Sequence, residues 1–65
     1  MPWIHHVADP NEGNVTVCVR TPNGDPPDSA VTYTGPRTGN SRTILPGAGW
    51  TEVDECPADS IAGTP

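Results

Sequence analysis

Hydrophobic and polar residues alternate most clearly in the segment Asn14–Arg20. The three valines, Val15, Val17 and Val19, share one side of this segment. The residues between and after them, Thr16, Cys18 and Arg20, share the other side. A period of two with one apolar side predicts a β-strand whose valine face is buried. On the opposite face, we expect Cys18 to be a small apolar contact beneath the N-terminal segment or a neighbouring subunit.

A second strand is predicted over Ser29–Thr34, because Val31 and Tyr33 there share one face. The segment between the two strands, Thr21–Asp28, contains Asn-Gly and Pro-Pro steps and therefore predicts a loop. We expect residues 15–20 and 29–34 to pair as an antiparallel hairpin.

Shorter strands are predicted at Arg42–Leu45 and Trp50–Asp54, with turns rich in Gly and Pro around them. Residues 1–8 carry apolar side chains on both faces, and the segment Asp9–Gly13 is dense in turn formers. Residues 1–13 are predicted to form an N-terminal arm or an edge strand. Residues 55–65 are predicted to form an extended or irregular tail. The predicted fold is thus all-β: a small antiparallel domain of three to four short strands over residues 14–54, flanked by the arm and the tail.

The composition leaves little material for a core. The chain has 65 residues, among them nine Pro, seven Gly, a single Leu and no Phe. Domains of this length bury only about 60% of their unfolded surface and commonly need a disulfide, a metal or a partner. We therefore expect the chain to depend on a partner surface.

The net charge of −5, with three Arg and no Lys, argues against nucleic-acid and anionic-membrane partners. It is compatible with docking on a basic protein surface. The first ten residues lack the basic and apolar regions of a signal peptide, so we expect the chain to be made in a cytosol.

Two cysteines, Cys18 and Cys56, leave two interpretations open. A disulfide between them would stabilise a chain with so small a core by about 4 kcal/mol. The expected cytosolic compartment favours two free thiols instead.

The same cysteines and a His pair supply ligand types that zinc accepts: His5, His6, Cys18 and Cys56. No CxxC or HxxxH spacing is present, and adjacent residues of a strand point to opposite faces, so these four are only weak zinc candidates. We expect no cofactor.

No catalytic motif is apparent. The three serines lack a nucleophile elbow, and the acidic residues are explained as solvated charge or as partners of Arg. A chain this small can hardly exclude water from an active site, so we expect no enzymatic activity.

The segment Val31–Asp54 resembles short proteins encoded among the head and head–tail genes of tailed phages that infect actinobacteria. The resemblance covers about a third of the chain, and its matching residues are Val31, Tyr33, Gly35, Pro36, Arg42, Ile44, Gly49 and Val53. It implies a small virion accessory protein, such as a capsid decoration protein or a minor head component, and it carries over no catalytic residue.

Together these observations predict a structural protein of a phage virion, assembled in the host cytoplasm and binding neighbouring capsid or other virion subunits in many copies. The expected anchors are Trp3, Ile4, Tyr33 and Trp50, with Arg37 and Arg42 for charge pairing, since Trp, Tyr and Arg dominate binding hot spots. For Trp3 and Trp50, a place in the small core is an equally good interpretation. The alternative function is a small zinc- or disulfide-stapled binding or inhibitor module.

Overall fold

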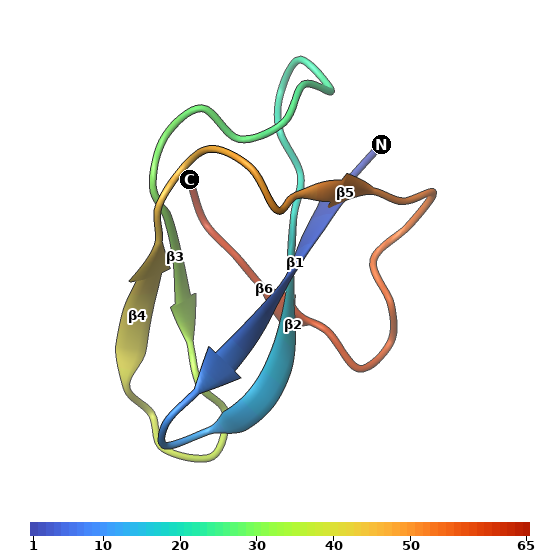
Figure 1. Ribbon diagram of the computed structural model, residues 1–65. Coiled ribbons are helices and arrows are strands. Elements are labelled where there is room, and N and C mark those ends of the chain that lie inside the picture. Colours follow the sequence, from blue (N-terminus) through green and yellow to red (C-terminus); the bar gives the residue numbers. More distant parts are fainter.

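A computed structural model describes residues 1–65 and shows an all-β fold without helices (Figure 1). None of its elements, accordingly, is a helix long and apolar enough to cross a membrane. The six strands are β1 (Trp3–Asp9), β2 (Gly13–Val19), β3 (Val31–Thr34), β4 (Ser41–Ile44), β5 (Thr51–Glu52) and β6 (Ile61–Ala62). Four of them form a sheet in the order β5-β1-β2-β6, and β3 and β4 form a second, two-stranded sheet.

The longest pairing joins β1 and β2, which run antiparallel from the pair Trp3–Val19 to the pair Asp9–Gly13. The turn between them contains Pro10, Asn11 and Glu12, a sequence of turn formers that brings the two strands directly back together. β1 also pairs with β5 on its other side, but only at Trp3 and Ile4. The prediction of an arm was wrong, because the segment pairs with β2 along its length; beyond Ile4, the side of β1 away from β2 has no neighbour, as predicted for an edge strand.

The predicted hairpin of residues 15–20 with 29–34 was also wrong, because β2 pairs with β1 and β3 pairs with β4. The Pro-rich loop after β2 carries the chain away to the second sheet, whereas the turn after β1 is short enough to close a hairpin. The predicted tail contains β6, which pairs with β2 in parallel. The tail is therefore part of the domain.

The two sheets are joined through the C-terminal segment. Beyond β6, Thr64 exchanges two backbone hydrogen bonds of 2.8 Å with Thr32 of β3. A continuous path of neighbouring strands thus runs from β5 through β1, β2, the C-terminal segment and β3 to β4. The path does not close, since β4 and β1 are not paired with each other. The fold is an open barrel with a gap between these two strands.

The core lies inside this path and consists of five buried side chains. They are contributed by β2, β3 and β4: Val17, Val19, Val31, Tyr33 and Ile44. The valine face of β2 is therefore buried, as its alternation predicted. Both Trp side chains are half-buried and pack against this cluster.

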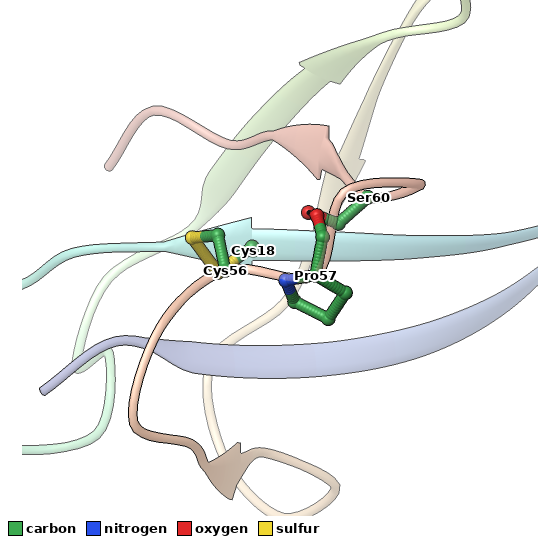
Figure 2. The surroundings of a disulfide bond; sticks show 4 residues. All are labelled: Cys18, Cys56, Pro57 and Ser60. Carbon is green, nitrogen blue, oxygen red and sulfur yellow. Dashed lines mark hydrogen bonds between the residues drawn. A yellow bond between two sulfur atoms is a disulfide. The ribbon is translucent and has the colours of Figure 1, made fainter.

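A disulfide between Cys18 and Cys56 joins the opposite face of β2 to the C-terminal segment, with a Cα–Cα distance of 5.7 Å (Figure 2). Beside it, Ser60 folds the segment back by donating from Oγ and N to the carbonyl oxygen of Pro57. Cys18 is 2% exposed, although it points away from the core. It is covered by its own chain, and the expectation of two free thiols was wrong.

We expect reduction of this disulfide to lower the free energy of unfolding by about 4 kcal/mol, because the bond joins residues 38 positions apart in a chain with few core residues. Denaturant unfolding of the oxidised and reduced chains measures the difference. The variant carrying both Cys18→Ala and Cys56→Ala is the control for thiol chemistry and should resemble the reduced chain. Equal stability of the oxidised and reduced chains would contradict the prediction.

Candidate functional site

The carboxylate of Asp9, at the end of β1, connects the two sheets. Its Oδ1 accepts hydrogen bonds from the backbone N–H groups of Asn11 and Glu12, at 2.8 and 2.9 Å. Its Oδ2 accepts from the Tyr33 hydroxyl on β3 and from Nε of Arg42 on β4, both at 2.9 Å. One buried side chain therefore shapes its own turn and fixes the position of the second sheet.

Glu12 makes a second connection at the same end of the molecule. Its carboxylate accepts from the backbone N–H groups of Arg37 and Thr38, at 2.6 and 3.1 Å, in the turn between β3 and β4. The Arg37 guanidinium also donates to the Glu12 carbonyl oxygen at 3.4 Å. Both hairpin turns thus lie together (bottom of Figure 1), joined by polar bonds.

The electrostatics of this cluster favour ionised Asp9 and neutral Tyr33. The backbone N–H groups of Glu12 and Asn11, and more weakly Tyr33 and Arg42, hold the pKa of Asp9 below its ordinary value of 3.8. Burial and the adjacent Asp9 carboxylate raise the pKa of the Tyr33 phenol above its ordinary value. An Asp9 carboxylate that stays ionised and a Tyr33 phenol that stays protonated suit a structural connection between the two sheets.

Above this cluster, an open groove of about 450 Å³ follows the gap between β1 and β4. Its apolar lining includes Val7, Tyr33 and Ile44, whereas Asp9 and Arg42 add an ion pair. No strand, loop or terminus of the 65 residues pairs with the edges on either side of it. The groove is therefore the part of the barrel that the chain leaves unfilled.

Of the six residues predicted as partner anchors, Tyr33 and Arg42 are engaged inside the molecule. Tyr33, predicted as a partner anchor, is a core residue with 3% exposure. The Arg42 guanidinium is paired with the buried Asp9 carboxylate. Arg37 is exposed, and its guanidinium contacts the Glu12 carbonyl oxygen of its own chain.

The other three predicted anchors lie on or beside the four-stranded sheet and are half-buried. Trp3 donates from its indole N–H to the carbonyl oxygen of Gly24, at 3.1 Å. Trp50 packs edge-on against the His5 ring, with centroids 5.1 Å apart, and its buried indole N–H has no acceptor. Ile4 stands opposite Cys18, on the disulfide side of β1.

The four weak zinc candidates do not form a site. Cys18 and Cys56 are joined to each other, which removes both thiolates. His5 points towards Trp50, and His6 on the other face contacts the Thr16 hydroxyl at 3.0 Å. Adjacent strand positions separate the two rings, as the sequence indicated.

Three important residues were not singled out from the sequence: Asp9, Glu12 and Leu45. Asp9 and Glu12 were interpreted only as turn formers. An Asp that begins a turn often accepts from the N–H group two positions later, and this signal could have indicated the role of Asp9. Leu45 is 77% exposed after β4, which only the tertiary structure reveals.

Comparison with protein-family models, curated proteins and solved structures found no match to this chain.

Asp9→Asn should destabilise the fold at neutral pH and should weaken its dependence on acid. Because the folded-state pKa of Asp9 is lowered, the ionised carboxylate stabilises the fold above about pH 3.8, and this contribution is lost as pH falls through the folded-state pKa. Denaturant unfolding at pH 7 and at pH values below 4 measures it. The stability difference between wild type and variant should shrink with acidification; a constant difference would contradict the assignment.

Gly35→Ala should destabilise the fold by about 1–3 kcal/mol, because it disturbs a buried carboxylate that holds two N–H groups. A Cβ on Gly35 would lie 2.5 Å from Glu12 Oε2 and 2.9 Å from Glu12 Cδ. Chemical denaturation measures the loss. In the Glu12→Ala background, Gly35→Ala should lower the free energy of unfolding much less. An equal loss in both backgrounds would show that the strain arises elsewhere.

Proposed function

We propose that this chain is a small structural protein without catalytic activity that docks on a larger protein assembly. The observation that carries the proposal is the bare outer edge of β4. Four residues, Ser41–Ile44, have β3 on one side and nothing on the other. An unpaired edge presents backbone N–H and C=O groups to which another chain can add a strand.

The β4 edge lacks several of the features with which isolated proteins protect such strands, although it is short and carries the inward-pointing charge of Arg42. Residues 41–44 include no Lys and no Pro, and their pairing with β3 contains no bulge. The one charged side chain of β4, Arg42, is turned inwards to Asp9. The strongly exposed Leu45 continues the edge and adds an apolar contact.

The assembly that we propose is the virion of a tailed phage, with the chain as a decoration or minor head protein bound to capsid or other virion subunits in many copies. The resemblance over Val31–Asp54 supports this proposal, as does an acidic chain suited to basic subunit surfaces. Assembly would take place in the host cytoplasm. The disulfide is compatible with it, because virion surfaces are among the oxidising locations where disulfides persist.

The buried polar groups support a structural role over a catalytic one. Both oxygens of Asp9 and both oxygens of Glu12 accept hydrogen bonds from elsewhere in the chain. The Tyr33 hydroxyl is likewise engaged with Asp9. These groups have partners already, which suits anchoring the fold.

A second candidate is a disulfide-stapled binding or inhibitor module, and the Cys18–Cys56 bond favours it. A covalent connection between distant segments of a chain with a small core is the usual device of small domains that work outside the reducing cytosol.

Protein analysis of purified particles separates the two candidates. If the chain is a virion component, mass spectrometry of gradient-purified particles from the organism that encodes it should find it at a constant ratio to the major subunit. The ratio should survive washing in about 1 M salt if strand pairing contributes, since exposed charge pairs are screened there. Absence from the particles, with the chain free in the culture medium, would contradict the virion role and favour the second candidate.

A further inference from the structure

The groove between β1 and β4 has two walls, and both present unpaired backbone groups. The direction of these groups follows from the pairing on the other sides of the strands. On β3, Thr32 directs both its N–H and its C=O to Thr64, so it makes no backbone bond to Thr43, its neighbour in register. Thr43 therefore directs its own N–H and C=O away from β3, and Ser41 does the same two positions earlier.

The same alternation holds for β1. The carbonyl oxygen of Pro2 accepts from Val53 on the β5 side, and Ile4 pairs with Thr51 on that side. Two and four positions later, β5 has ended, so His6 and Ala8 direct their backbone groups to the same open side. Among these backbone groups, only the His6 carbonyl oxygen has a partner within the chain. It accepts a hydrogen bond from the His5 ring at 2.8 Å.

From this arrangement we infer that the groove accepts one extended segment of a partner protein, which completes the barrel by pairing with β1 and β4 together. The segment would exchange backbone hydrogen bonds with Ala8 and the His6 N–H on one wall and with Ser41 and Thr43 on the other. The inference rests on the proposed function and deepens it, because it names the site and the form of the docking partner.

The floor of the groove defines the side chains of this segment. Val7, Tyr33 and Ile44 offer an apolar surface, and at one end the Asp9–Arg42 pair is already neutralised. Residues of an inserted strand alternate between this floor and solvent. The segment should therefore carry small apolar or β-branched residues at every second position and polar residues between them, with no charge facing the floor.

The geometry favours a partner's segment over a part of this chain or a second copy. Near the N-terminus Pro2 pairs with Val53, and near the C-terminus Thr64 pairs with Thr32, so both ends are engaged elsewhere. A second copy could offer only the edge of its own sheet. Such an edge could pair with one wall, but it arrives with its sheet attached and does not fit between two walls.

Proline substitution tests the inference at the backbone. Thr43→Pro removes an N–H that faces the groove, whereas Thr34→Pro removes one that faces the opposite edge of the same hairpin. Both threonines are exposed, and neither N–H has a partner within the chain, so both variants should fold. The two positions are thus matched in residue type and exposure, and they lie on the two strands of one hairpin.

The probe is a displayed library of random linear twelve-residue peptides, selected on the oxidised wild-type chain. Selected peptides should show the alternating pattern, and calorimetry should show binding at least tenfold weaker to Thr43→Pro and unchanged for Thr34→Pro. Equal binding to all three chains would overturn the inference, as would the failure of the library to yield any peptide with a Kd below about 100 μM.

Hydrogen exchange on the wild-type chain gives a second readout that needs no variant to fold. The amides of His6, Ala8, Ser41 and Thr43 should exchange rapidly in the free chain and at least tenfold more slowly with bound peptide. Protection of only one wall would contradict a strand inserted between both. A concentration-dependent dimer in sedimentation that Thr43→Pro abolishes would also overturn the inference, in favour of self-pairing.

These measurements use the isolated chain and are independent of any particle. The absence of the chain from virions would therefore leave the groove intact as a peptide site. Conversely, a chain that is present in virions but binds no extended peptide would retain the proposed function and lose the groove.

Discussion

The carboxylate of Asp9 is the interaction on which the arrangement of the two sheets depends. It is 4% exposed, and it accepts hydrogen bonds from two N–H groups of its own turn and from one side chain on each strand of the other sheet. A buried charge with fewer donors would be costly, whereas four donors hold it in one position. Glu12 repeats the device three residues later, so the two hairpin turns are held together without apolar side chains.

This polar connection explains how a chain with so few apolar residues holds one shape. Five side chains form the buried core, and a disulfide closes the opposite face of β2. The disulfide and the two carboxylates lie at different places: the former holds the C-terminal segment on the four-stranded sheet, and the latter hold the hairpin turns. Together they connect the C-terminal segment and both hairpin turns to the rest of the domain.

The short length of the chain also leaves the barrel open. The chain has enough strands to surround its core on most sides, but β5 covers only the first part of β1, and β4 has no outer neighbour. The unpaired groups of both strands then face one groove. Polar and covalent connections hold the two sheets and the C-terminal segment together, while the backbone groups that face the groove stay largely unpaired within the chain.

The sequence by itself determined the all-β class, the buried valine face of β2, and, to within a residue or two, the places of β2, β3 and β4, because alternation with period two is a local property. It did not determine which strands pair, since β5 with β1, β6 with β2 and Thr64 with Thr32 depend on contacts between distant segments. The candidate site was predictable only in part. Arg42 and Tyr33 were singled out from their residue types. Tyr33 shares the buried face with Val31, as alternation predicted, whereas the inward direction of Arg42 follows from the position of Asp9. The groove exists only because β1 and β4, far apart in the chain, end up on either side of the one gap that no strand fills. Only the tertiary structure decided this, because an edge is defined by the absence of a neighbour and has no local signature.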